Sequence, residues 1–155
     1  MKTRPLSELG PEERGLIVRV GGSGEIRRRL LDMGVVAGAE VEVERTAPLG
    51  DPVQIRIKGY DLALRKREAE TINVEVLVGP ISEAESGETV TVVSVRAGWG
   101  LQRRLKDMGL IPGTPVRIIN AGMTGQLLIE VRGSRLALGH GMAGKILVKA
   151  GGSHD

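Results

Sequence analysis

The chain has 155 residues, of which 41% are hydrophobic and 26% are charged. These are ordinary values for a folded protein, and they exclude both an intrinsically disordered chain and a membrane protein. The absence of Cys excludes a disulfide scaffold, a thiolate metal site and a Cys nucleophile, and a formal net charge of only +3 is not typical of a polyanion binder.

Large aromatic residues are almost absent from the sequence. Phe does not occur, and Tyr60 and Trp99 are the only aromatic side chains. Gly accounts for 23 of the 155 residues, about twice its usual share. The hydrophobic core must therefore be aliphatic, and frequent glycine turns are expected.

The first predicted elements are a strand and a single clear helix. Residues 16–20 are rich in β-branched side chains, which favour a strand. Residues 24–33 are predicted to form a helix, and Gly34 follows where a helix C-terminal cap is needed. The apolar side chains that recur at i, i+4 and i+7 on one face of this helix are Ile26, Leu30 and Met33.

Four further strands are predicted after the helix. Val41 and Val43 alternate with acidic residues, which is the period-2 pattern of a half-buried strand. A tight turn at Gly59 and Tyr60 is expected to join the second and third of these strands in an antiparallel sheet. One short helix on five short, curved strands indicates a small barrel. The four strands are predicted at residues 41–43, 53–57, 62–64 and 72–76.

The whole pattern occurs twice. Residues 28–34 recur with a single change as residues 103–109, and the similarity continues on both sides. Such a period indicates a tandem duplication. The sequence therefore predicts a mostly β protein of two tandem small barrels, each of about five strands with one short α-helix. Their predicted bounds are residues 1–76 and 77–150, followed by a disordered tail at residues 151–155.

An apolar side chain on the first helix is a candidate for a binding site. At about 100° per residue, Leu31 projects between Arg27 and Arg28, away from the core-facing stripe. It is either an exposed anchor with a polar rim for a partner, or it packs on a neighbouring unit or loop. The corresponding residue of the second copy is Lys106.

The arginines of the two helices permit a simpler interpretation. Arg28 and Arg103 each precede an Asp by four residues, which predicts surface ion pairs of about 0.3 to 0.5 kcal/mol. Residues 27–29 are all Arg and would suit an acidic partner or a phosphate. The same run is also typical of a solvated face, because the first half of the chain balances its basic residues with equally many acidic ones.

Trp99 and the loop at residues 47–52 are the remaining candidates. Trp99 lies between two Gly residues just before the second helix, where it either anchors a partner or covers the junction between the two units. The loop contains two prolines that preorganise it, with Leu49 at its tip and Asp51 beside it. The alternative is an ordinary connection whose Leu49 folds back on the core.

The sequence contains no recognisable metal-binding or catalytic pattern. His140 and His154 are the only histidines, and no cluster of His, Asp and Glu has ligand spacing. No His stands beside a candidate nucleophile, and no paired carboxylates share one element. We therefore expect no cofactor, no metal site and no enzymatic activity.

Several motifs together resemble the FeoA family of small proteins associated with bacterial ferrous iron transport. They are Leu-Ser-Glu-Leu at residues 6–9, Arg-Arg-Leu-Leu-Asp-Met-Gly at residues 28–34, Ala-Pro-Leu-Gly-Asp-Pro at residues 47–52, and the segment at residues 59–65. The second copy resembles the family too, but its loop at residues 123–126 is one residue shorter.

The resemblance implies an SH3-like barrel with an inserted helix, in a cytoplasmic accessory protein that acts on the FeoB iron transporter. The same fold is found as the C-terminal domain of metal-dependent repressors of the diphtheria-toxin-repressor type. Because no winged-helix segment precedes the fold in this sequence, we expect no self-contained repressor.

The sequence thus predicts an interaction module that docks on the cytoplasmic part of FeoB, with a possible homo-oligomer and no direct membrane insertion. The alternatives are a nucleic-acid-binding small barrel and a metal-dependent regulatory domain. Nucleic acid is not expected, because single-strand binding uses stacking aromatics that this chain lacks, although duplex binding through phosphates stays open. The predicted partner-binding residues are Arg27, Arg28, Leu31, Leu49, Asp51, Trp99 and Arg103.

Overall fold

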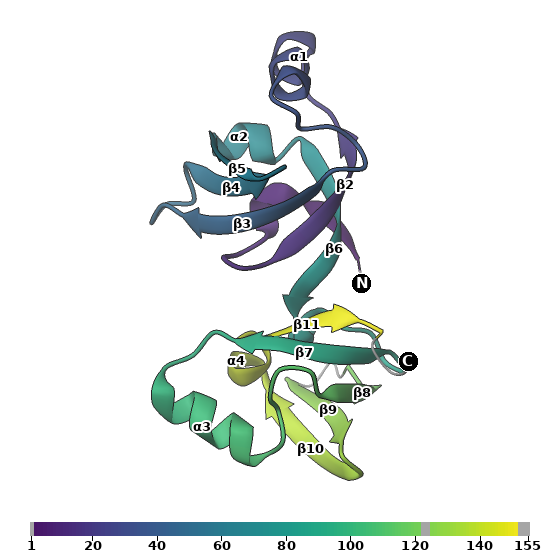
Figure 1. Cartoon of the computed structure of the whole chain (residues 1–155). Helices are drawn as coiled ribbons and strands as arrows, with labels where there is room; N and C mark the ends of the chain where they lie inside the picture. Colours follow the sequence, from purple (N-terminus) through teal and green to yellow (C-terminus); the bar gives the residue numbers. More distant parts are fainter. Residues whose placement is uncertain (1, 122–124, 152–155) are drawn as a thin grey trace. The chain divides into compact units, whose positions relative to one another are not determined.

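The structure, a computed structural model, describes residues 2–121 and 125–151. Its contacts divide the chain into two compact units, Lys2–Leu77 and a second unit that begins at Val78. Each unit repeats the same order of elements (Figure 1). The two units are described separately below.

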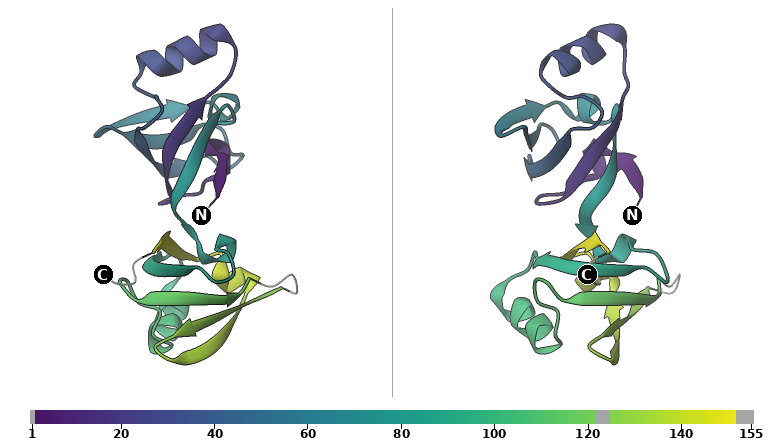
Figure 2. Two further views of the ribbon diagram at one scale, coloured as in Figure 1. Left: turned by 90° about the vertical axis from the view of Figure 1, so that its right-hand side faces the viewer. Right: turned by 45° about the vertical axis from the view of Figure 1, so that its right-hand side comes forward.

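The first unit is an antiparallel sheet with one helix of nine residues. The order of neighbouring strands is β1, β6, β2, β3, β4, β5. Helix α1 connects β2 to β3 and lies to one side of the strands (Figure 2). The strands are β1 (Thr3–Pro5), β2 (Arg14–Val20), β3 (Glu40–Thr46), β4 (Val53–Ile57), β5 (Tyr60–Leu64) and β6 (Ile72–Pro80), and the helices are η1 (Leu6–Glu8), α1 (Gly24–Asp32) and α2 (Lys66–Ala69).

The second unit repeats this arrangement. The neighbouring strands follow the order β6, β11, β7, β8, β9, β10, and α3 connects β7 to β8. The elements are η2 (Ile81–Glu83), β7 (Thr89–Val95), α3 (Trp99–Asp107), β8 (Pro115–Asn120), β9 (Gln126–Val131), β10 (Ser134–Gly139), α4 (His140–Ala143) and β11 (Ile146–Ala150).

Strand β6 contains the last strand of one copy and the first strand of the next. Residues 73–75 pair with β1 of the first unit. Residues 78–80 pair with β11, in the same register that β1 uses against β6. Residues 78–80 are therefore the second copy's equivalent of β1.

Both cores are aliphatic, as the composition predicts. In β4, Ile55 and Ile57 are at most 1% exposed while Arg56 between them faces solvent. In the second unit, Leu105 of α3 joins a cluster of aliphatic side chains from the strands. Because alternate strand residues point to opposite faces, the period-2 pattern selects the buried side.

The predicted turn at Gly59 and Tyr60 lies one residue earlier in the structure. Lys58 and Gly59 are the central residues, with φ of 51° and 85°, and Tyr60 already begins β5. Two consecutive positive φ angles are typical of the type I′ turn, whose twist matches that of a hairpin. Arg132 and Gly133 repeat this turn in the second unit.

The predicted fold class, mostly β with two tandem SH3-like units, is confirmed. Each unit has more short elements than expected, because α2 and η1, like α4 and η2, are too brief to give a periodic signal. Among the described residues, the strand pairing does not close into a complete ring. Instead, α2 packs against η1, burying Ala69 and Leu6.

The predicted tail falls mostly outside the described residues, which end at Gly151. The backbone N–H of Gly151 donates to the carbonyl oxygen of Thr89 at 2.9 Å. The shortened loop of the second copy, at residues 123–126, also lies largely outside the described part of the chain.

Candidate partner-binding sites

A groove of about 580 Å³ lies on the second unit, between α3 and the segments on either side of it. Its floor is apolar, since Leu110 is buried and Val95 and Ile111 are half-buried. Exposed side chains of α3 form its rim, so the site is an open groove rather than a closed cavity. The rim residues used below are Trp99, Arg103 and Lys106.

Trp99 is exposed at this rim. Its side chain is 75% exposed, and the Arg103 guanidinium carbon lies 5.4 Å from the centre of its ring. A cation over an indole face at this distance is favourable by about 0.5 to 1 kcal/mol on a protein surface. The structure thus brings together two of the residues that the sequence proposed separately.

The wall of the groove is held in place by Gln102. Its Nε2 donates to the carbonyl oxygen of Val95 at 3.3 Å and to that of Ala97 at 2.8 Å. These bonds join α3 to the end of β7. In the first unit the equivalent residue is Arg27, whose Nε donates to the carbonyl oxygen of Val20 at 3.1 Å. Arg27, predicted to bind a partner, therefore also holds α1 on β2.

Helix α1 presents a different surface from α3. Arg28 is exposed. Leu31 is half-buried, which lies between the two alternatives of a fully exposed anchor and a side chain packed on a neighbouring segment. Leu31 lies near the C-terminus of the helix, where the Tyr60 hydroxyl donates to the carbonyl oxygen of Met33. Among the described residues, neither predicted surface ion pair, of Arg28 or of Arg103 with the Asp four residues on, is formed.

A buried carboxylate fixes α1 to the rest of the first unit. Glu68 of α2, whose side chain is 3% exposed, forms an ion pair with Arg29. Its other oxygen accepts the backbone N–H of Arg65 at 2.8 Å. In the second copy the equivalent of Glu68 is Met142, so Arg104 has no such partner there.

The loop at residues 47–52 exposes its apolar tip. Leu49 is 90% exposed, so the alternative in which it folds back on the core is wrong. Asp51 is also exposed, and its Oδ1 accepts the backbone N–H of Lys66 at 3.1 Å. This bond ties the loop to the start of α2 rather than to α1.

A family model named FeoA domain matches this chain twice, at residues 4–76 and 79–150. Together the two matches cover nearly the whole sequence. The chain belongs to the FeoA domain family. The tandem duplication inferred from the repeated motif is thus a pair of FeoA domains.

Two relatives and one solved structure are similar to this chain. A protein of Porphyromonas gingivalis named Fe(2+) transport protein A/Fe(2+) transporter FeoB fusion protein is 34% identical over 97% of this chain, and this chain spans 18% of that protein's length. A putative Fe(2+) transport protein A of Methanocaldococcus jannaschii is 37% identical over 45% of this chain and 84% of its own length. The solution structure of iron(II) transport protein A from Clostridium thermocellum is 34% identical, covers 96% of this chain and 89% of that one, and superimposes with a TM-score of 0.56.

The sequence of this FeoA tandem did not reveal most of the groove. Gln102 of α3 and Ile111 beyond it belong to the site but carry no motif, and Lys106 stood out only as the residue at the position of Leu31. Their only signal is position, since they lie on the helix or directly follow it. The sequence named Trp99 as the sole tryptophan, between two glycines, and Arg103 as the counterpart of Arg28, four residues before an Asp.

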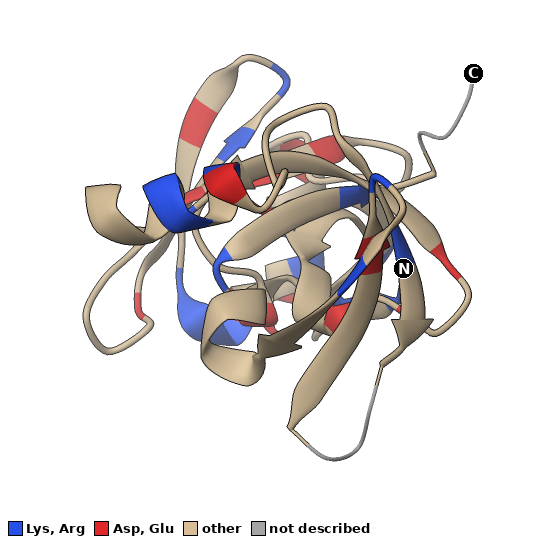
Figure 3. Ribbon diagram, turned by 90° about the horizontal axis from the view of Figure 1, so that it is seen from below, with Lys and Arg blue, Asp and Glu red and all other residues tan. Residues whose placement is uncertain are grey.

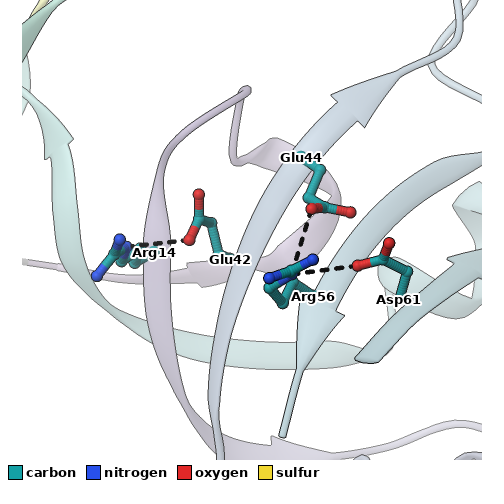
Figure 4. A network of polar contacts seen from close by, with 5 residues as sticks. All are labelled: Arg14, Glu42, Glu44, Arg56 and Asp61. Atoms are coloured by element: carbon teal, nitrogen blue, oxygen red, sulfur yellow. Dashed lines mark hydrogen bonds and ion pairs between the residues drawn. The ribbon is translucent and has the colours of Figure 1, made fainter. Parts of the chain in front are cut away.

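The exposed face of the first FeoA domain carries a network of charged side chains across four strands. Arg14 lies 3.3 Å from Glu42, and Arg56 lies 3.4 Å from Glu44 and 3.2 Å from Asp61 (Figure 4). Burial, and then a hydrogen bond and repulsion from Asp61, raise the pKa of Glu44, against the opposing effect of Arg56. This network is a set of surface ion pairs.

The described residues offer no group of three His, Cys, Asp or Glu side chains placed to hold a metal ion. His140 begins α4 and is exposed, while His154 lies outside the described part of the chain. No helix in the described part is both long and apolar enough to span a bilayer.

Proposed function

We propose that this chain is a non-enzymatic accessory protein of ferrous iron transport, which binds the cytoplasmic part of the transporter FeoB and changes its activity. The observation that carries the proposal is the match of 97% of this chain to a protein named as a fusion of the transport protein with FeoB. Two proteins that occur as one polypeptide in a relative are candidates for association when they are separate. The proposed location is the cytoplasm, where that part of the transporter would be reached.

The proposed contact surface consists of exposed side chains. Trp99 and Arg103 on α3, Arg28 on α1 and Leu49 on its loop meet this condition. Large exposed apolar side chains surrounded by polar ones are typical of binding surfaces. Arg27, Leu31 and Asp51 are placed at the edge of the proposed surface, because each already contacts its own unit or is half-buried.

The proposal is tested by titrating the full chain against the separately produced cytoplasmic domain of FeoB. We expect saturable binding in the micromolar range, and slower or faster Fe²⁺ uptake in cells that lack the chain. Absence of binding at high micromolar concentrations of both proteins, with uptake unchanged, would rule the proposal out.

A parallel titration with duplex DNA at about 50 mM salt tests the nucleic-acid alternative, since phosphate contacts are strongest at low salt. Exposed basic residues on α3 are the feature that would support it (Figure 3). We expect no shift, because the chain's charge is nearly balanced. The metal-dependent alternative is tested by repeating the FeoB titration with Fe²⁺ and with a chelator, which we expect to give equal affinities.

A further inference from the structure

The two FeoA domains differ most in the groove beside the helix. At the positions of Trp99 and Lys106, the first unit has Gly24 and Leu31. Neither of these first-unit residues supplies an aromatic ring or a positive charge. The groove of the second unit therefore has an aromatic and a cationic group that its duplicate lacks, on a shared backbone.

The charge of this groove has one sign. Arg103 and Lys106 stand on its rim, and none of the residues that line it is acidic. Within the described residues, neither cation lies within ion-pair distance of a carboxylate. Both side chains are exposed, so they have no role in the core. Two cations one helical turn apart beside an apolar floor are complementary to acidic side chains that flank an apolar one.

The contact between Arg103 and Trp99 leaves Arg103 able to bind a carboxylate. A guanidinium that covers a ring face keeps its N–H edge free to bind a carboxylate with two hydrogen bonds. The contact also favours, by about 0.5 to 1 kcal/mol, the indole orientations in which the two side chains meet, which lowers part of the entropy lost on binding. Gln102 fixes the helix that carries both groups to the end of β7. The site is therefore organised before a ligand arrives.

We propose that this groove binds a short acidic segment of the partner, in which an apolar side chain enters the floor over Val95 and Ile111 while neighbouring carboxylates meet Arg103 and Lys106. The inference deepens the proposed function. It rests on that function, because it takes the acidic segment to belong to the cytoplasmic domain of FeoB. It also assigns different roles to the two units, because the equivalent surface of the first unit lacks the aromatic and one of the two cations.

The test uses the full chain labelled with ¹⁵N. Because Trp99 is the sole tryptophan, its indole N–H gives a single signal that reports directly on the groove, and an unlabelled partner adds none. The probes are the cytoplasmic domain of FeoB, a synthetic peptide of alternating glutamate and leucine, and a peptide with lysine in place of glutamate. We expect the first two to shift the indole signal and the third to leave it in place.

The variants compare groove residues with a neighbour on the same helix. Trp99→Ala and the double variant Arg103→Glu with Lys106→Glu should each weaken binding of the FeoB domain by about tenfold or more, as for residues at the centre of an interface. Arg104→Glu, a charge reversal at an exposed residue of α3 that does not line the groove, is the matched control and should bind like the parent chain. All four residues are exposed, so the fold is expected to persist, and the backbone spectrum of each free variant checks this.

Each other outcome separates the two proposals. If the FeoB domain binds but neither variant changes its affinity, the groove inference is wrong and the proposed function stands. If the domain does not bind while the glutamate peptide shifts the signal, the groove takes acidic segments but the transporter is not their owner. If the signal instead moves with the concentration of the chain alone, a second copy occupies the groove and the inference is overturned.

Discussion

Arg29 and Glu68 lie far apart in the sequence and join α1 to α2 in the first unit. Glu68 is buried, and its two oxygens are used by Arg29 and by the backbone of Arg65. A buried carboxylate that loses its cation keeps the cost of desolvation without the compensating attraction. The Arg29 side chain is 59% exposed, however, so solvent screens part of that attraction.

Arg29→Ala is expected to destabilise the first unit by about 1 to 2 kcal/mol, because it leaves Glu68 buried without a counter-charge. The matched control is Arg104→Ala in the second unit, where the change should stay within about 0.5 kcal/mol because no buried carboxylate faces it. Denaturant-dependent hydrogen exchange in β4 and in β9 measures the two units separately. Equal effects of the two substitutions would contradict this account.

Glu44 is the residue whose protonation should make the first unit sensitive to pH. Because its pKa is raised, the folded state binds a proton more readily than the unfolded state. Relative to Glu44→Gln, the parent chain should therefore gain stability as the pH falls through the range just above the ordinary pKa of a glutamate. The measurement is the difference in free energy of unfolding between the two proteins across that range. A difference that moves the opposite way, or a Glu44 carboxyl signal that titrates below the ordinary pKa of a glutamate, would refute the assignment.

The ends of the two long helices show how one element adapts to different neighbours. Gly34 and Gly109 both follow the helix with positive φ, of 88° and 90°, which only Gly adopts without strain. A Cβ at Gly34 would lie 2.9 Å from the Tyr60 hydroxyl, whereas at Gly109 the nearest atom, on Val131, is at 3.4 Å. The first position is therefore constrained by a neighbour as well as by its own backbone.

Gly34→Ala should destabilise its unit more than Gly109→Ala destabilises the other. Both pay about 1 kcal/mol for the left-handed conformation, and Gly34→Ala in addition displaces Tyr60 from the Met33 carbonyl, at about 0.5 to 1.5 kcal/mol. In a Tyr60→Phe background this excess should disappear. Unfolding free energies for the single and double variants decide it, and an excess that survives without the hydroxyl would show that the cause lies elsewhere.

The strands of the two units carry opposite charges at equivalent positions. In the first unit Arg56 pairs in register with Glu42 and Asp61. In the second unit Glu130 pairs in register with Arg117 and Arg135. Arg56 and Glu130 are each flanked by two residues of the opposite charge. The cross-strand pattern is therefore kept, while every charge in it is inverted. The duplication therefore preserved the pairing of charges rather than their identity.

At the scale of the whole molecule, the duplication reuses one strand. The first six residues of β6 belong to the first unit. Residues 78–80 pair with the last strand of the second unit, as residues 3–5 pair with the last strand of the first. We propose that the domain boundary falls between Leu77 and Val78, inside a continuous strand. Val78, Gly79 and Pro80 are all buried, and they pair with β11 as a neighbouring strand.

Fragments test this boundary. A fragment of residues 78–155 should fold with the Trp99 signal of the full chain. A fragment of residues 81–155 should melt several degrees lower, because β11 loses its pairing with Gly79 and Pro80. For domains of this size 1 kcal/mol corresponds to about 4 to 8 °C. Thermal unfolding followed by circular dichroism measures the difference, and identical melting of both fragments would place the boundary after Pro80.

The sequence by itself determined the features that depend on neighbours along the chain. The period-2 pattern around Val41 and Val43, the helix that ends before Gly34, and the second copy of both are local regularities, because backbone geometry repeats at fixed intervals. The family followed from the same motifs. Short elements such as α2 were not predicted, because four residues are too few to show a period.

Tertiary structure alone decided which side chains are free to bind. Leu31 and Lys106 occupy the same helical position, yet one is half-buried and the other lines an open groove. Leu49 is exposed, although an apolar side chain in this loop was also consistent with a place in the core. Exposure depends on atoms brought near by distant segments, and periodicity along a single chain contains no information about those segments.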